Sequence, residues 1–245
     1  MTENGYAMPE DEIDIQPWPV IELIGRAVSL ATIARRGMLE VDDERDIFDL
    51  ETDRFDLSTW SRTELQNWIS DRELALLNIS IGELDEDRLA DCDDALVSAS
   101  TIAWALRGIE LDRLPVPQDI SVEEEVLVWA PQPWMKVRQL QSRVRLRSDQ
   151  DLADERERWE LWYWRATDGE EDPSALAEVV HEVAAAGLIE VHDGDFATDD
   201  GIRFSDLDSE TKDAIAWLAG LRLRALNWTC GFGPTWEAAP LYLDD

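Results

Sequence analysis

Apolar side chains recur at intervals of three and four residues between positions 87 and 107, and this spacing constrains the fold more than any other feature of the sequence. The stripe consists of Leu89, Cys92, Leu96, Ala99, Ala103 and Leu106. Such spacing places the apolar groups on one face of an α-helix, and the aspartates between them fall on the other faces. The segment therefore predicts a helix that buries one side and ends at Gly108.

Weaker forms of the same pattern predict helices along most of the chain. The first begins near Trp18 and is expected to end at Gly37, before an acidic loop that runs through Asp56. Ser61 and Glu64 have the spacing of a capping box, which predicts a short helix after them. Further helices are expected near residues 71–77, 121–129, 149–166, 173–187 and 209–228.

One small β-hairpin is expected near residues 188–204. Asp193-Gly194 is a tight-turn signal, and it lies between two short apolar pieces. The predicted fold class is therefore mainly α: a single multi-helix domain over residues 17–245, preceded by a polar tail over residues 1–16. An apolar content of 44% with 12 tryptophans is enough for a sizeable core.

The chain carries a formal charge of −33, from 55 acidic and 22 basic side chains. One explanation is adaptation to high salt, where the screening length falls to roughly 3 Å near 1 M. The scarcity of lysine, with only Lys136 and Lys212, favours it. A second is an ordinary acidic protein encoded by DNA that favours arginine. A third is an acidic inhibitor or nucleic-acid mimic that blocks a basic partner, although the scattered arginines interrupt any phosphate-like array.

The sequence predicts a cytoplasmic protein without membrane contact. Its first residues are acidic where a secretory signal would be basic, and no apolar run approaches the roughly 20 residues that span a bilayer. Cys92 and Cys230 are expected to be buried thiols in a reducing compartment.

No residue pattern indicates a catalytic or metal site. The histidines, His181 and His192, lack the spacing of zinc ligands, and no serine lies in a Gly-x-Ser-x-Gly turn. The turn at residues 231–234 is not followed by a helix whose N-terminus would bind phosphate. No catalytic residue, metal ligand or cofactor is therefore assigned.

The stretch between Glu125 and Asp149 departs from the acidic background, because it contains no acid. Its charged residues are Lys136, Arg138, Arg143, Arg145 and Arg147. In an extended segment the last three would share one side. Either they pair with surrounding carboxylates, or they bind a small anion or an acidic protein segment, since guanidinium groups bind carboxylates bidentately.

Trp162, in the tryptophan-rich segment at 159–164, and Arg165, directly after that segment, are added to the basic stretch as candidate site residues. The candidate binding residues are Arg138, Arg143, Arg145, Arg147, Trp162 and Arg165. The strongly negative chain opposes direct binding to nucleic acid, so a protein partner is expected.

The C-terminal segment resembles the closing signature of a known family. Residues 225–234 read Ala-Leu-Asn-Trp-Thr-Cys-Gly-Phe-Gly-Pro, with Arg222 before them and Trp236-Glu237 and Pro240 after them. This pattern is similar to the family called domain of unknown function 4272. Segments 161–166, 194–196, 104–106 and 26–30 resemble that family's Trp-Arg helix, hairpin, central helix and first helix.

The resemblance implies a mainly helical fold and no known activity. It marks Arg222, Asn227, Trp228 and Trp236 as a structural motif. We expect Trp228 to pack in the core and Asn227 to bond the backbone of the following turn. The chain departs from the family at Leu221, where an acid is usual, and at residues 241–243, where a Thr-Asp-Thr segment is usual.

The sequence favours a non-catalytic interaction or accessory protein. One alternative is an enzyme of unassigned chemistry that uses an Arg/Trp-lined cleft, and the acidic inhibitor or mimic is another.

High-salt adaptation predicts that added salt stabilises the fold, because screening relieves repulsion among the carboxylates. Thermal melts between about 0.05 and 2 M KCl should show a Tm that rises with salt. A Tm that stays flat across the series rejects the adaptation.

Overall fold

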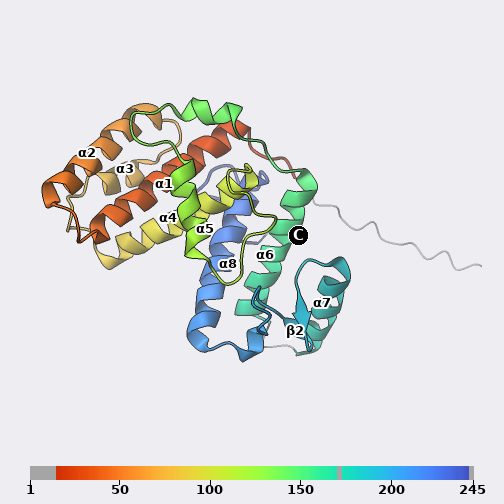
Figure 1. Ribbon diagram of the computed structural model, residues 1–245. Helices are drawn as coiled ribbons and strands as arrows, with labels where there is room; N and C mark the ends of the chain where they lie inside the picture. Colours follow the sequence, from red (N-terminus) through yellow and green to blue (C-terminus); the bar gives the residue numbers. More distant parts are fainter. Residues whose placement is uncertain (1–14, 170–172, 243–245) are drawn as a thin grey trace, which may run out of the picture.

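The computed structural model describes residues 15–169 and 173–242, and this part of the chain is mainly helical (Figure 1). The helices are α1 (Val20–Val41), α2 (Ile47–Glu64), α3 (Asp71–Leu77), α4 (Glu86–Ala105), α5 (Ile120–Trp129), α6 (Asp149–Thr167), α7 (Pro173–Ala186) and α8 (Ser209–Thr229), with 3-10 turns η1 (Val137–Ser142) and η2 (Phe204–Asp206). The mainly α fold class with one small hairpin is confirmed.

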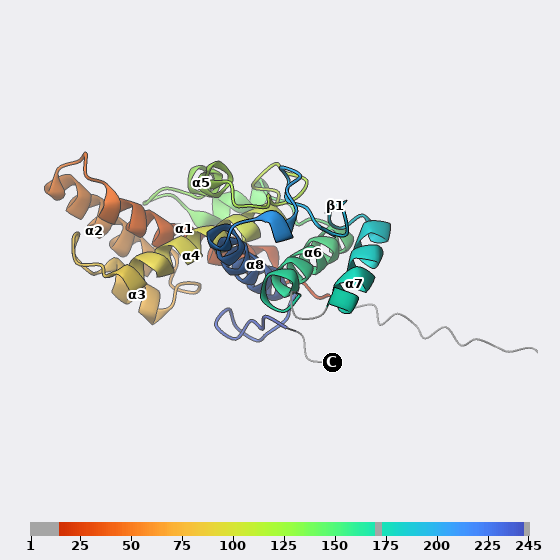
Figure 2. The ribbon, with the colours of Figure 1, turned by 90° about the horizontal axis from the view of Figure 1, so that it is seen from below.

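The helices form an elongated body. Helices α2 and α3 lie at one end, and α7 lies with the hairpin at the other, as the views of Figures 1 and 2 agree. Between these ends α1 packs along α4, α6 packs along α8, and α4 also contacts α8. None of the helices in the described ranges has the length and apolar character needed to cross a bilayer.

The core consists of two apolar clusters that share two helices. One surrounds α1 and includes Leu23, Ile24 and Trp60; the other lies between α6, α8 and the hairpin. Helix α4 gives Ile102 to the first cluster and Trp104 to the second. Helix α8 likewise contributes to both clusters, so α4 and α8 join the two halves.

The predicted central helix is confirmed as α4, and its burial exceeds the expectation. The Asp85 side chain caps its N-terminus by accepting a hydrogen bond from the Arg88 backbone N–H. From Ala95 to Ala105 every residue is buried, not only the residues of the apolar stripe. Serine and threonine side chains there donate to backbone carbonyls, as Thr101 does to Val97, so the helix can pack on all sides.

The expected boundaries near α1 and α2 are wrong. Helix α1 continues past Gly37, which is buried where α1 crosses α4: a Cβ there would lie 2.6 Å from the Cβ of Cys92. The acidic loop is largely helix, since α2 begins after Asp46, whose side chain accepts from the Phe48 N–H. Ser61 lies inside α2.

The actual capping box in this region opens α3. The Ser70 side chain accepts from the Glu73 backbone N–H, and the Glu73 carboxylate accepts from the Ser70 backbone N–H. The same arrangement opens α6 at Ser148 and Asp151. In both boxes the N-cap serine is itself extended, whereas Ser61 is helical and so cannot be an N-cap.

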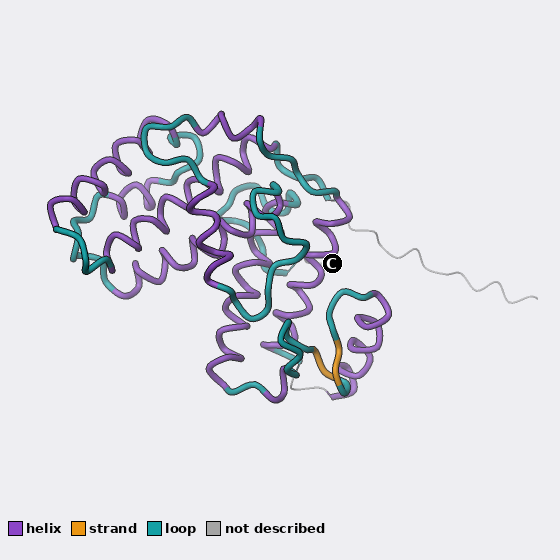
Figure 3. Tube along the Cα trace, viewed as in Figure 1, coloured by secondary structure: helices purple, strands orange, loops and turns teal. Residues whose placement is uncertain are grey.

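The predicted hairpin is present as β1 (Val191–His192) and β2 (Asp195–Phe196), which pair antiparallel (Figure 3). Asp193 and Gly194 form the turn with φ values of 48° and 80°. Two successive positive φ angles match the twist of a two-residue hairpin turn.

The predicted tail at residues 1–16 lies outside the described residues, apart from Ile15 and Gln16. The Gln16 backbone N–H donates to the Cys230 carbonyl at 2.9 Å, and the Trp18 N–H donates to the Thr229 carbonyl at 3.3 Å. The chain therefore enters α1 along the C-terminus of α8.

Candidate binding surface

The six candidate residues of the sequence do not form one site. Arg147 is buried at 8% exposure, with its guanidinium 4.1 Å from the Trp104 ring centroid. Its Nε donates to the Trp104 carbonyl at 2.9 Å, and its Nη2 donates to the Leu111 carbonyl. Arg147 therefore caps the end of α4 from inside the protein.

Trp162 and Arg165 are also interior residues. Trp162 is 1% exposed and packs edge-on against Phe196, with ring centroids 5.5 Å apart. Arg165 donates from Nε and Nη2 to the two carboxylate oxygens of Asp195, at 2.8 and 3.0 Å. These contacts attach the hairpin to α6, and they leave neither side chain a surface for a ligand.

The Asp195 carboxylate shows how the hairpin is held. Burial raises the pKa of Asp195, but hydrogen bonds from Arg165 and Ser205 outweigh burial and leave the pKa below its ordinary value. The guanidinium of Arg165 also lies 4.4 Å from the Phe204 ring centroid. A charged pair is therefore retained inside this end of the protein.

The other three candidates, Arg138, Arg143 and Arg145, are exposed. No side-chain hydrogen bond or ion pair joins them to another residue in the described ranges. The backbone N–H of Arg145 donates to the Leu106 carbonyl at 3.2 Å, which fixes the segment against the end of α4. The expected shared side is not observed, because Arg147 turns to Trp104 while Arg145 faces solvent.

Arg222 of the C-terminal motif forms a fully buried ion pair. Its Nη2 donates to Oε1 of Glu123 at 2.6 Å, and both side chains are 0% exposed. Its Nη1 donates to the Pro115 carbonyl at 2.7 Å, and its guanidinium lies 4.5 Å from the Trp159 ring centroid. Burial raises the pKa of Glu123 and lowers the pKa of Arg222.

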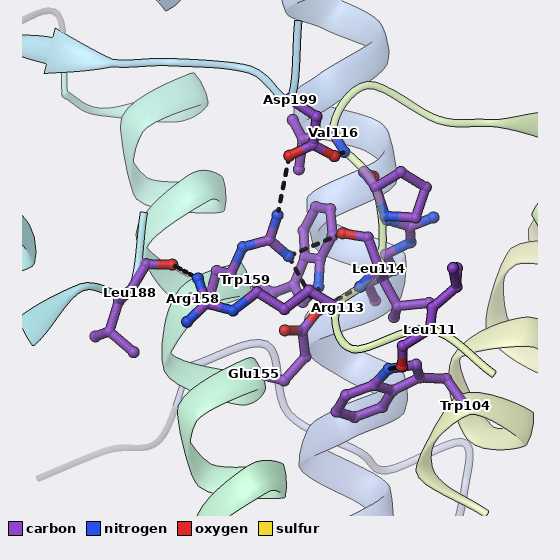
Figure 4. Close-up of polar contacts among 12 residues, drawn as sticks. Trp104, Leu111, Arg113, Leu114, Val116, Glu155, Arg158, Trp159, Leu188 and Asp199 are labelled. Atoms are coloured by element: carbon purple, nitrogen blue, oxygen red, sulfur yellow. Dashed lines mark hydrogen bonds and ion pairs between the residues drawn. The ribbon is translucent and has the colours of Figure 1, made fainter. Parts of the chain in front are cut away.

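Pro115 lies in the connection between α4 and α5, and a second buried network holds this connection (Figure 4). Glu155 of α6 accepts hydrogen bonds from Arg158, from the Trp159 indole and from the Leu114 backbone N–H, at 3.0, 2.8 and 3.1 Å. Arg158 also donates to the Leu114 carbonyl at 2.9 Å. Leu114 and Pro115 are thus fixed by side chains of α6 and α8.

Asn227 and Trp228 have structural roles. The Trp228 ring is 6% exposed and lies between those of Trp18 and Trp236, at centroid distances of 5.9 and 5.6 Å. Asn227 donates to the Pro240 and Leu241 carbonyls at 2.9 and 3.1 Å. Trp228 thus packs in the core as predicted, whereas Asn227 bonds the tail beyond the glycine-rich turn.

A groove of about 660 Å³ lies between the end of α1, the middle of α2 and the loop at residues 132–134. Its apolar walls come from Met38, Leu39, Val41, Leu57, Pro133 and Trp134. Three of these side chains are exposed large apolar groups: Met38 at 46%, Val41 at 68% and Trp134 at 59%. An apolar concavity with exposed walls is the usual form of a binding site.

The loop that carries Trp134 is fixed by hydrogen bonds. Arg35 donates to the carbonyls of Leu127, Ala130 and Pro131 at 2.6, 2.7 and 2.7 Å. Burial lowers the pKa of Arg35 to about 10. Trp134 itself has a φ of 72°, a conformation that L-residues with large side chains rarely adopt.

The charged rim of the groove is acidic. Asp42, Asp53 and Asp56 line it, and the only basic lining residues are Arg35 and Arg45. Arg45 pairs with Asp53 at 2.6 Å, while Arg35 is bonded to carbonyls. Within the described ranges neither Asp42 nor Asp56 forms an ion pair, so both keep unbalanced negative charge at the rim.

Sequence reasoning missed this groove. Its walls come from three separate segments, and the expected helix end at Gly37 placed Met38 and Val41 in a loop. The available signal was Trp134 directly after Pro131-Gln132-Pro133, a large apolar residue in a segment with turn residues and no helical pattern.

No metal centre or reactive thiol is found in the described ranges. No group of three or more histidine, cysteine or acidic side chains there converges on one point. Cys92 and Cys230 are free and buried, as expected, and burial raises the pKa of each thiol to about 12. Neither thiol is therefore a thiolate nucleophile near neutral pH.

Comparisons with known proteins give no match to a family model, to a curated protein or to a solved structure. The resemblance to the domain of unknown function 4272 family remains a prediction, and function is argued from the geometry of this chain alone.

The different positions of Arg147 and Arg145 predict different effects of the same substitution. Arg147→Gln should lower the free energy of unfolding by roughly 2 to 3 kcal/mol, because buried carbonyls lose charged donors. Arg145→Gln should change it by less than about 0.5 kcal/mol. Urea denaturation of the two variants makes the comparison, and equal effects would contradict the assigned positions.

Proposed function

We propose that this protein acts without catalysis, by binding a partner protein in the groove formed by α1, α2 and the loop at residues 132–134. The supporting observation is the combination of an apolar concavity with three exposed apolar side chains, Met38, Val41 and Trp134. Contiguous exposed apolar surface of this kind marks interaction sites in folded proteins.

The conformation of Trp134 supports the same proposal. A positive φ at a tryptophan costs about 1 to 3 kcal/mol, and such strain concentrates at functional sites. Here the exposed ring gains little burial to offset it. Arg35 and the Trp60 indole, which donates to the Met135 carbonyl at 2.9 Å, hold the loop in place. Trp134 is thus presented at the groove in a fixed position, which lowers the entropy lost on binding.

The groove fits an amphipathic helix of the partner with basic residues beside its apolar face. A helix places apolar anchors at intervals of three and four residues, and such faces dock in apolar grooves. Lysine or arginine on its flanks would face Asp42 and Asp56 at the rim. The −33 charge of the chain would also attract a basic partner and speed its association.

The exposed arginines provide a second contact region for acidic residues of the partner outside this helix. Arg143 lines a hollow of about 130 Å³ together with Val128, Met135 and Lys136. This hollow and the groove share Gln132, so the loop at residues 130–136 separates them. Arg138, Arg143 and Arg145 have no side-chain partners in the described ranges, which leaves them available.

A peptide selection tests the proposal. Random 16-residue peptides displayed on phage, selected against the wild-type protein, should yield apolar sequences with helical spacing and basic flanks. Their Kd should be about 1 to 100 μM, and Trp134→Ser should weaken binding at least about tenfold, as loss of a central aromatic anchor does.

Phe48→Ser is the matched control, because Phe48 is an apolar α2 residue that is 76% exposed and does not line the groove. It should change the affinity less than about twofold. Selected peptides that bind Trp134→Ser as tightly as wild type would contradict the proposal, and so would a selection that enriches no groove-binding peptide.

A further inference from the structure

A second pocket, of about 330 Å³, lies between the start of α1, the connection from α2 to α3 and the C-terminal segment. It is separate from the groove of the proposed function, since no residue lines both. Its aromatic walls are Trp18, Trp68, Trp228 and Trp236. Two of these rings, Trp228 and Trp236, belong to the C-terminal motif, and neither lines the groove.

The tryptophan rings are held in a fixed arrangement. Trp18 stacks on Trp228 with an interplanar angle of 21°, and Trp236 meets Trp228 nearly at right angles, at 81°. Trp68 packs on the bare backbone of Gly25, where a Cβ would overlap its ring. The Trp68 indole N–H donates to Glu22 at 2.9 Å. The pocket is therefore lined by rings that are positioned before any ligand binds.

Cations already contact one of these rings within the protein. The guanidinium groups of Arg26 and Arg224 lie 4.8 and 5.7 Å from the Trp236 ring centroid. Both distances are within the range of cation–π attraction. Arg26 brings little net charge to the pocket, because it forms a two-point ion pair with Glu73. The electron-rich ring of Trp236 thus attracts positive groups within the protein.

Two carboxylates give the pocket negative charge. Glu22 and Glu237 both line it, and neither has an ion pair with a described residue. Among the contacts of the described ranges, the Glu22 carboxylate accepts a hydrogen bond only from the Trp68 indole. Indole faces together with carboxylates suit an organic cation, whereas a hard metal ion needs several oxygen ligands instead.

We propose that this pocket binds a small alkylammonium ion, with its methyl groups against the tryptophan rings and its charge near Glu22 and Glu237. A volume of about 330 Å³ accommodates a ligand of the size of choline. The site does not depend on the protein-binding groove, so each proposal can fail without the other.

Titration calorimetry with choline and with its uncharged isostere 3,3-dimethyl-1-butanol tests the pocket. In 0.15 M NaCl choline should bind at one site with a Kd below about 1 mM and change the tryptophan fluorescence, while the isostere should bind at least about tenfold more weakly. Equal affinity for the two probes would overturn the proposal, as would the absence of saturable choline binding.

The double variant Glu22→Gln/Glu237→Gln separates the pocket from the general negative field of the protein. It should weaken choline binding at least about fivefold, while the amide oxygen at position 22 can still accept the Trp68 hydrogen bond. Glu124→Gln/Glu125→Gln removes the same charge from exposed positions of α5 and is the matched control. An equal loss in both double variants would show that choline responds only to net charge and would overturn the proposal.

Discussion

The structure depends on the buried ion pair between Arg222 and Glu123. It joins α8 to α5 across 99 positions of sequence, and both side chains are fully buried. A buried charge is costly unless it is paired and hydrogen-bonded. Both Nη atoms of Arg222 donate, and its buried Nε has no hydrogen-bond partner among the described residues. The Pro115 carbonyl and the Trp159 ring bind the same guanidinium, and Ser100 of α4 donates to Glu123. Four helices therefore meet at this pair.

Arginine has the same interior role elsewhere in the chain. Arg147 bonds carbonyls at the end of α4, Arg158 bonds the connection from α4 to α5, and Arg165 holds the hairpin. Each of these three guanidinium groups also lies near an aromatic ring. A planar group with five donors can bind a carbonyl, a carboxylate and a ring face together, which lysine cannot. This use of arginine fits a chain with 12 tryptophans and two lysines.

The elements that the sequence predicts are those with a regular local pattern. Helix α4 has an unbroken stripe from Leu89 to Leu106, and the hairpin has an Asp-Gly turn. The acidic loop before residue 56 was wrong because α2 buries few residues, Leu50 and Leu57 among them, and exposes apolar side chains on its other faces. Gly37 predicts a helix end, but α1 continues past it and the glycine instead allows close contact with Cys92.

The candidate site was harder to predict than the helices. Residue spacing along the sequence shows which side chains share a face, but not which other residues those side chains contact. The alternating pattern predicts that Arg145 and Arg147 share one side of an extended segment. In the structure only Arg147 contacts the Trp104 ring and bonds two carbonyls. The groove and the tryptophan pocket combine segments far apart in the chain, such as Met38 with Trp134 and Trp18 with Trp236. Both hollows lie around α1, whose position relative to α8 depends on the shared core.

A double-mutant cycle on Arg222 and Glu123 tests the central claim most directly. Arg222→Met should lower the free energy of unfolding in urea by roughly 3 to 5 kcal/mol, because it leaves a buried carboxylate unpaired. Adding Glu123→Gln to this variant should restore part of the loss, with a coupling energy above about 1 kcal/mol. Additive effects of the two substitutions, or a loss below about 1 kcal/mol for Arg222→Met, would contradict the dependence of the fold on this pair.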